Sequence, residues 1–449
     1  MTMQLRMELR RSTAPLAALA AALLYALLLW RYQQKWSPGW PDLSTDLRFD
    51  LSILVPLALG AGAWQGGRER RGRTEELLAT TSRPIWQRVL VPGAAVAGGT
   101  VAGVLLPLVV AAGRHGPGLW LGQAWPFLVV LTGLLALVAA VALGVGLGHA
   151  IRSNLVAPLL MFVLALVLVY TSILDVGWGL RFSPVLPEPA YGDITNAMRV
   201  RPAVTLGQVL WFGGVLAGGL ILAGATRWRG RALAGAAVLA GFAVAVPLLA
   251  SDGGAAYDTD PVAVQTVCAP GLPPVCGTKV HEAGVLKAAA PARQVLAALK
   301  RLPDPPTRAI ETESWDDTTF AYPARPLGPD TIGIWALTPD ADSQADIAQS
   351  LADGLGVPSD QCDRLLANGS TKEKDAVTSG MWTARELAGA WLLNRTVSAD
   401  DNPDLARDLR KFRALPEAEQ IRRMAAARTA FVECRPGALA LLAGSGKAS

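Results

Sequence analysis

Residues 124–148 read AWPFLVVLTGLLALVAAVALGVGLG, a run that contains no charged side chain. An α-helix needs about 20 apolar residues to cross the ~30 Å hydrocarbon core of a bilayer. This run therefore predicts a membrane-spanning helix, and it is the clearest of about seven. We expect spans at 14–32, 51–66, 90–112, 124–148, 155–174, 205–225 and 232–250. The predicted fold class is an α-helical polytopic membrane protein.

Residues 251–449 contain no comparable run and form a second region. Charge changes at the same place, because residues 1–250 carry 19 Arg, one Lys and 10 acidic residues, whereas the remainder carries 21 basic and 26 acidic residues. The overall net charge of +5 is thus the sum of a basic part and an acidic part. The basic residues gather at span ends, as they do in membrane proteins. We expect a lipid bilayer and no nucleic acid as partner.

The distribution of Arg predicts the orientation. When the segments between spans are assigned alternately to two sides, one side holds 13 Arg against four acids, and the other, Arg31 included, holds six Arg and Lys35 against six acids. Cytoplasmic loops carry the excess of positive charge. We therefore expect a multi-pass membrane protein with its N-terminus in the cytoplasm and residues 251–449 outside. The Ala-, Gly- and Arg-rich, Lys-poor composition of residues 1–250 favours a bacterial plasma membrane.

All four cysteines lie in the second region, which favours an oxidising compartment. Zinc is the alternative, but zinc sites favour closer cysteine pairs than the nearest one here. Four cysteines allow three disulfide connectivities, of which we favour Cys268 with Cys276 and Cys362 with Cys434.

The periodicity of the second region predicts a mainly helical α+β domain. The expected elements are a strand at 331–337 and helices near 282–302, 342–354, 373–396, 403–413 and 416–434. Trp382 and Trp391 are expected to pack in its core.

The segment between the second and third spans reads GRERRGRTEELLATTSRPIWQRV, residues 67–89. Thr74 followed by two acids has the form of a helix start, and Leu77 and Leu78 supply a short apolar face. The basic residues before it can lie at lipid headgroups. This pattern predicts a cytoplasmic amphipathic helix parallel to the membrane.

This segment resembles the coupling helix of the type-2 ABC exporter permeases. The resemblance extends more loosely over residues 1–225, with an interfacial N-terminal helix, six spans and a long outer loop. It implies three parts, which are a permease core at 1–225, an additional span at 226–250 and an added extracytoplasmic domain at 251–449. The extra span and the outer domain are not part of the minimal family pattern.

In that family the coupling helix docks on a separate ATP-binding subunit. The resemblance implies that this partner would contact Glu75, Glu76, Leu77, Leu78 and Thr80, and that Arg70, Arg71 and Arg73, around Gly72, would orient the helix. It also implies pairing with a second copy or a sister permease. ATP and Mg²⁺ would be bound by the partner, so we expect no cofactor, metal or catalytic residue on this chain.

Absent motifs narrow the function further. No Gly-x₄-Gly-Lys-Ser/Thr sequence occurs, so the chain lacks the usual phosphate-binding loop. An enzyme or sensor anchored on the outer face is the first alternative. An ion-coupled carrier is the second, and it is disfavoured because the predicted spans are nearly free of ionisable residues. The transported substrate stays open, as does export against another ATP-driven role.

Overall fold

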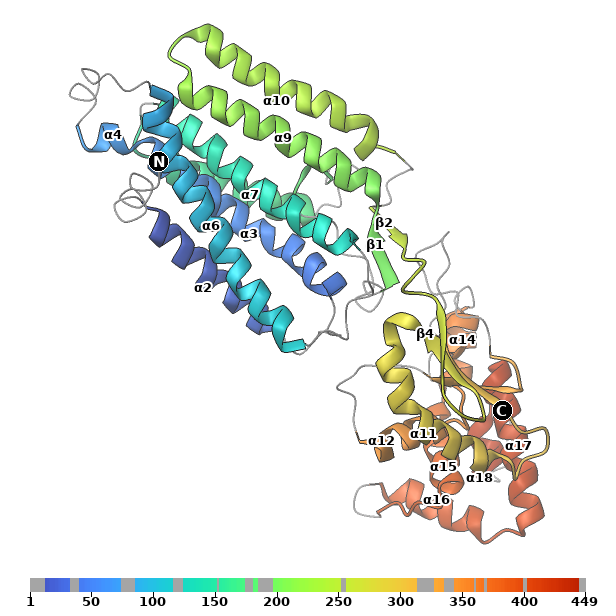
Figure 1. Ribbon diagram of the computed structural model, residues 1–449. Helices are drawn as coiled ribbons and strands as arrows, with labels where there is room; N and C mark the ends of the chain where they lie inside the picture. The colour runs from blue at the N-terminus through green and yellow to red at the C-terminus, as the bar shows by residue number, and fades with distance from the viewer. Residues whose placement is uncertain are drawn as a thin grey trace. The chain divides into compact units, whose positions relative to one another are not determined.

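The structure is a computed structural model, and it divides the chain into two compact units, Met1–Asp258 and Thr259–Ser449. The residues that it describes are 13–32, 40–73, 85–115, 124–151, 153–173, 181–184, 197–251, 256–312, 327–334, 343–358, 361–366, 370–398 and 402–443. Helices dominate both units (Figure 1).

The first unit is a bundle of apolar helices (Figure 1). Its helices are α2 (Ala14–Tyr32), α3 (Trp40–Gly66), α4 (Arg68–Arg71), α6 (Ile85–His115), α7 (Trp125–Ala150), α8 (Val156–Ile173), α9 (Pro202–Gly224) and α10 (Trp228–Leu249). Within the described part of the chain, five helices are long and apolar enough to cross a bilayer, namely α3, α6, α7, α9 and α10. The apolar stretches of α2 and α8 are shorter. The chain is thus a helical membrane protein, as its composition predicts.

Helix α3 corrects the prediction of the second span. The sequence predicts a start at residue 51, whereas the helix begins at Trp40, with Pro41 in its first turn. Proline is favoured there because its missing N–H would be unsatisfied in any case. The earlier start places Arg48 and Asp50 inside the bundle, where they are 2% and 1% exposed. The expectation that the spans are nearly free of buried charge is therefore wrong for α3.

Helices α3 and α7 cross with their backbones in close contact. A Cβ atom at Gly144 would lie 2.2 Å from the carbonyl oxygen of Leu59, and one at Gly148 would lie 2.1 Å from that of Ala63. Only glycine fits at such a distance, and small residues are what let helix backbones approach in lipid. These two contacts fix α7 against α3 over about one turn.

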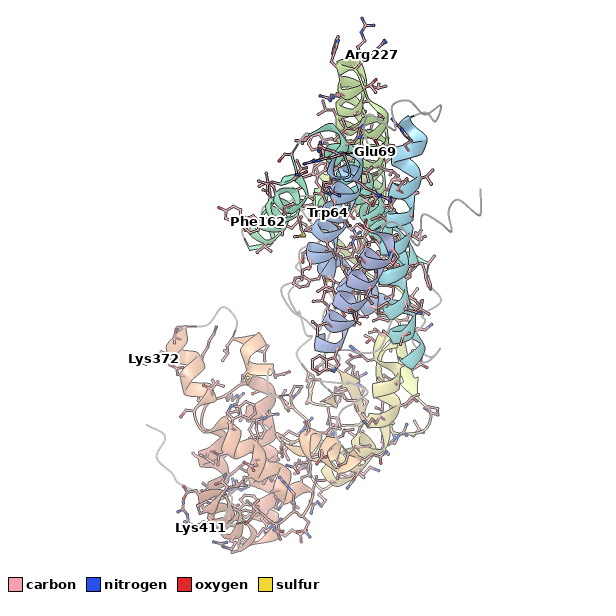
Figure 2. All side chains as sticks on the ribbon, turned by 90° about the vertical axis from the view of Figure 1, so that its left-hand side faces the viewer. Trp64, Glu69, Phe162, Arg227, Lys372 and Lys411 are labelled. Carbon is pink, nitrogen blue, oxygen red and sulfur yellow. A yellow bond between two sulfur atoms is a disulfide. The ribbon has the colours of Figure 1, made fainter. Side chains whose placement is uncertain are left out.

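The outward faces of α2, α8 and α10 are apolar. Leu16, Phe162 and Leu239 are exposed by 71%, 62% and 68%, and Phe162 projects from α8 away from the bundle (Figure 2). Contiguous exposed apolar surface on helices of this length is suited to lipid.

The two ends of the bundle differ. Helix α4 and the turn between α9 and α10 lie at one end, and strands β1 (Met198–Val200) and β2 (Tyr257–Thr259) lie at the other (Figure 1). The strands pair in a two-stranded sheet, and the Arg201 guanidinium lies 2.6 Å from the Asp258 carboxylate. In the long outer loop, residues 198–200 form a strand, and most of residues 175–196 lie outside the described residues.

The second unit contains a four-stranded sheet in the order β3 (Thr266–Ala269), β4 (Val275–Thr278), β5 (Arg308–Glu311), β6 (Thr331–Ile334). The first pair is antiparallel and the other two are parallel. Helix α11 (Glu282–Leu299) makes the crossover that a parallel pair such as β4 and β5 requires. The sequence predicts β6 but misses the other three strands.

Helices cover this sheet and enclose the core of the unit. After η5 (Lys279–His281) and α11 they are α12 (Gln344–Ala352), α13 (Gln361–Leu365), α14 (Thr371–Thr378), α15 (Met381–Leu392), α16 (Pro403–Arg413), α17 (Glu417–Glu433) and α18 (Ala438–Ala443). The single helix expected at 373–396 is divided into α14 and α15 at Gly380, whose φ of +71° no ordinary helix residue adopts.

Two disulfides join the cysteines in the pairs favoured above. Cys268 pairs with Cys276 across the β3–β4 hairpin, and Cys362 pairs with Cys434 at the end of α17. Both lie in the second unit, which is what a domain in an oxidising compartment would contain.

Candidate functional site

A cavity of about 490 Å³, partly open to the outside, lies between helices of the bundle. This volume falls within the ~300–1,000 Å³ range of ligand pockets. Its walls come from α3, α7, α8, α9 and the short segment 182–184, and they are almost entirely apolar. The lining residues are Val55, Leu59, Ala136, Ala139, Ala140, Leu143, Leu147, Leu160, Val163, Leu164, Val167, Leu168, Phe182, Ser183, Pro184, Trp211, Phe212 and Val215.

Aromatic rings close the side of the cavity near α10. Phe182 contacts Trp211 edge to face at 5.7 Å between ring centroids and stacks on Phe242 at 4.6 Å. Such pairs add about 0.5–1.5 kcal/mol beyond their buried area. The segment 181–184 is thereby fixed against α9 and α10.

A buried polar pair, Arg48 of α3 and Gln208 of α9, lies beyond the wall formed by that segment. The Arg48 guanidinium donates a hydrogen bond to the side-chain oxygen of Gln208. The Gln208 amide nitrogen donates in turn to the carbonyl oxygens of Arg181, at 3.0 Å, and Ser183, at 2.9 Å. Because Ser183 lines the cavity, one hydrogen bond separates Gln208 from the cavity wall.

Helix geometry places this pair at one end of the cavity. Seven residues separate Arg48 from Val55, and seven separate Gln208 from Val215, which is about two turns in each case. Residues at this spacing share a helix face. The polar pair therefore extends the same two helix faces that form the apolar walls.

Arg48 has unused hydrogen-bonding capacity. Its Nε and Nη1 groups are buried and have no hydrogen-bond partner within the described ranges. Within the same ranges, no carboxylate lies within 4 Å of the guanidinium. A buried cation without a countercharge is costly unless a partner of opposite charge is supplied.

A second cluster of polar side chains is formed by Tyr25 of α2 and by Asp46 and Asp50 of α3. The Tyr25 hydroxyl is buried and lies within electrostatic range of Asp46 and Asp50. The Asp50 Oδ2 atom and the Tyr25 hydroxyl have no hydrogen-bond partner in the described part of the chain. Asp46 and Asp50 are four residues apart and therefore lie on the same face of α3. Arg48 lies on a different face.

The residues predicted to couple to an ATPase are described only in part. Six of them lie outside the described residues, namely Thr74, Glu75, Glu76, Leu77, Leu78 and Thr80. Arg70, Arg71, Gly72 and Arg73 lie on or directly after α4, at the end of the bundle opposite β1 and β2 (Figure 1).

Arg70 and Arg71 attach α4 to two long helices. Arg70 donates to the carbonyl oxygen of Gly148 in α7 at 3.0 Å. Arg71 donates to the carbonyl oxygen of Trp64 in α3, and its guanidinium lies 3.9 Å from the Trp64 ring centroid. Partial burial, with a contribution from the neighbouring Arg70, lowers the pKa of Arg71 from its usual value. Helix α4 is thus fixed to both helices of the glycine crossing.

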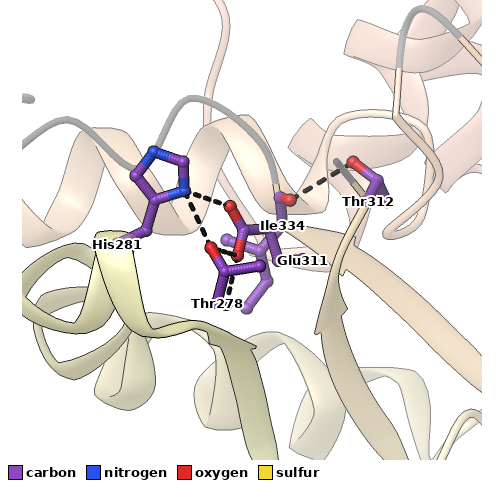
Figure 3. Close-up of polar contacts among 5 residues, drawn as sticks. All are labelled: Thr278, His281, Glu311, Thr312 and Ile334. Atoms are coloured by element: carbon purple, nitrogen blue, oxygen red, sulfur yellow. Dashed lines mark hydrogen bonds and ion pairs between the residues drawn. The ribbon is translucent and has the colours of Figure 1, made fainter. Parts of the chain in front are cut away.

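In the second unit, Thr278, His281 and Glu311 form one polar cluster (Figure 3). Glu311 Oε2 accepts from the Thr278 hydroxyl at 2.8 Å, and Glu311 Oε1 contacts His281 Nδ1. The Thr278 hydroxyl lies 3.2 Å from that same ring nitrogen. A nucleophile relay needs the hydroxyl and the carboxylate on opposite ring nitrogens, so this cluster joins β4, η5 and β5 without forming such a relay.

In the described residues, no cluster of three His, Cys, Asp or Glu side chains has the arrangement of a metal site. Sequence reasoning found the loop arginines, but it missed Arg48, Gln208 and the cavity because these residues meet only through helix packing. Comparisons with protein-family models, with curated proteins and with solved structures found no match to this chain.

Proposed function

We propose that this chain is the membrane-spanning subunit of an ATP-driven ABC exporter and works with separate ATP-binding subunits. The supporting observation is the attachment of α4 to both α3 and α7 by Arg70 and Arg71. A short helix that is held by two long ones can act as a lever, because a displacement of α4 must move the adjacent ends of both α3 and α7.

The connection from α4 to the cavity supports the same proposal. Val55 and Leu59 of α3 and Leu143 and Leu147 of α7 line the cavity, so the two helices that hold α4 also form its walls. Movement driven from a bound ATPase would change the shape of the cavity. In this proposal α4 is cytoplasmic, as the arginines at its end of the bundle favour, and the second unit is extracytoplasmic.

Co-purification from the native membrane tests the proposal. We expect an ATP-binding subunit to accompany the tagged wild-type chain and to be lost from the Glu75→Ala/Glu76→Ala variant. The matched control is Asp175→Ala/Glu188→Ala, which removes two acids from the predicted outer loop and should retain the partner. Absence of any ATP-binding subunit in several mild detergents would contradict the proposal.

An ion-coupled carrier is the second candidate, and the buried Asp50 and Tyr25 favour it. Ionisable side chains inside a membrane bundle commonly mark ion paths. Transport in vesicles separates the two candidates. Dependence on ATP, with no effect of a protonophore, supports the exporter, whereas loss of transport with a protonophore or in Asp50→Asn supports the carrier.

A further inference from the structure

We infer that the cavity of the first unit binds an amphipathic anion, with its apolar chain between α3, α7, α8 and α9 and its anionic head at Arg48. The inference names a ligand class for the bundle of the proposed transporter. Its test needs neither ATP nor a partner subunit, so it can succeed or fail independently of the proposed function.

The apolar part of the ligand follows from the cavity walls. Among the described residues that line the cavity, all except Ser183 are apolar. An apolar chain that enters the cavity from water would gain about 25 cal/mol for each Å² of its surface that is buried, and one that enters from the bilayer keeps an apolar environment and gains by close packing. A polar or multiply charged ligand would lose its hydration there without finding hydrogen-bond partners.

The anionic part follows from Arg48. Its side chain is 2% exposed, and the hydrogen bond that it makes within the described residues goes to the neutral amide of Gln208. The Nε and Nη1 donors that stay without a partner in the described ranges form part of the fork that binds carboxylates and phosphates. The Asp46 and Asp50 carboxylates lie on another face of α3 and make no ion pair with Arg48 within the described residues.

The position of the pair relative to the cavity joins the two parts. Arg48 and Gln208 lie on the same helix faces as Val55 and Phe212, and Gln208 is bonded to Ser183 of the wall. A chain lying along the cavity would thus have one end at Ser183, and the guanidinium of Arg48 lies directly behind the hydrogen bond between Ser183 and Gln208. A neutral or cationic head would leave Arg48 without a countercharge.

Photolabelling of the purified full chain in phosphatidylcholine nanodiscs tests this. The probes are octadecanoate with a diazirine near its methyl end and the alcohol with the same chain. We expect saturable labelling of peptides containing Leu164 or Val215, with apparent affinity at least about tenfold higher for the carboxylate than for the alcohol.

Variants separate the head from the chain. Arg48→Gln should abolish the preference for the carboxylate while alcohol labelling persists, which also shows that the cavity is still folded. Arg48→Lys should retain the preference, and Ala139→Phe, which fills the cavity, should reduce labelling by both probes. The matched control is Arg227→Gln, because Arg227 is exposed and lies at the other end of the bundle (Figure 2). This variant should change neither the preference for the carboxylate nor the labelling by the alcohol.

Two results would overturn the inference. One is equal labelling of the wild type by the carboxylate and the alcohol, and the other is a preference that survives Arg48→Gln. If Arg48→Gln fails to fold, the comparison of the two probes on the wild type and on Arg48→Lys decides. If added phosphatidylglycerol competes with the carboxylate probe, the anion is a bilayer lipid. If it does not compete, the anion is a free amphiphile.

Discussion

Trp382 and Trp391 are nine residues apart on α15, and they occupy opposite environments. Trp391 is 6% exposed and donates from its indole nitrogen to Gln420 at 2.7 Å, whereas Trp382 is 71% exposed. Nine residues correspond to two and a half turns of a helix, so the two side chains must point in opposite directions. The expectation that both pack in the core is wrong for Trp382, and the spacing itself gives the reason.

Charged residues are buried in both units, but their partners differ. Arg428 is 7% exposed and donates to the carbonyl oxygens of Pro329 and Thr331 at 2.8 and 3.1 Å. Burial lowers its pKa to about 10, which still leaves it charged at neutral pH. Backbone carbonyls satisfy this cation, whereas Arg48 keeps donors without partners in the described part of the chain.

Asp353 is predicted to make the stability of the second unit depend on pH. Burial raises the pKa of Asp353 to about 6. A raised pKa means that the folded state binds the proton more tightly than the unfolded state, so this destabilisation is absent below about pH 4, grows through pH 6 and is complete at neutral pH.

We expect Asp353→Asn to stabilise the second unit at pH 7.5 by about 1 kcal/mol after allowance for partial exposure, and to have no effect at pH 4. A rise of about 3 °C in the melting temperature should result at pH 7.5. Calorimetry of the full chain in nanodiscs at both pH values measures it, with the exposed Asp404→Asn as control. A stabilisation of equal size at pH 4 would exclude the titration of Asp353 as its cause.

At the scale of elements, the α3–α7 crossing depends on the absence of side chains. Gly148 and Gly144 each lie too close to a carbonyl oxygen of α3 for a Cβ atom. Glycine is a poor helix residue in water, and here its cost is offset by the contact that it allows. The crossing carries the attachment of α4, so its geometry matters to the proposed coupling.

Gly148→Leu is therefore expected to separate α3 from α7 and to destabilise the bundle by about 2 kcal/mol or more. Gly98→Leu is the matched control, because a Cβ at Gly98 meets nothing within 4 Å. Fluorescence-detected size-exclusion chromatography after heating measures both variants. Equal loss in the two would show that helix propensity, and not the crossing, is responsible.

The two disulfides close loops of very different length. The bond between Cys362 and Cys434 spans 72 residues, whereas the bond between Cys268 and Cys276 spans eight. By loop-closure entropy they contribute about 4 and about 2.5 kcal/mol. We expect Cys362→Ala/Cys434→Ala to increase amide hydrogen exchange in the core of the second unit more than Cys268→Ala/Cys276→Ala does. The reverse order would show that native contacts outweigh loop closure.

At the scale of the whole molecule, the proposed orientation makes a direct prediction for labelling. Leu272 and Trp228 are exposed by 85% and 74%, and they lie in the second unit and at the α4 end of the bundle. Since the native cysteines are paired, a single introduced cysteine reports its own side of the membrane.

A membrane-impermeant maleimide added to intact cells should label Leu272→Cys. It should label Trp228→Cys only after the membrane is permeabilised. The opposite pattern would invert the proposed topology, and with it the cytoplasmic position of α4.

The membrane class and the places of the apolar helices could be predicted from the sequence, because they depend on quantities that are local along the chain. A run of apolar residues either is or is not long enough for a bilayer, and charge bias at span ends is counted directly. The helix at 403–413 was likewise predicted at its observed bounds, since Asn402 and Pro403 mark its start locally.

The cavity and its polar end could not be predicted, because their residues come together only through packing. Arg48 and Gln208 are 160 residues apart, and local pattern placed Arg48 in a loop, since a charge interrupts an apolar run. In the folded bundle its cost depends on the groups that surround it, such as Gln208 of α9. A buried charge is therefore a property of the assembled helices, whereas the length of an apolar run is a property of the chain.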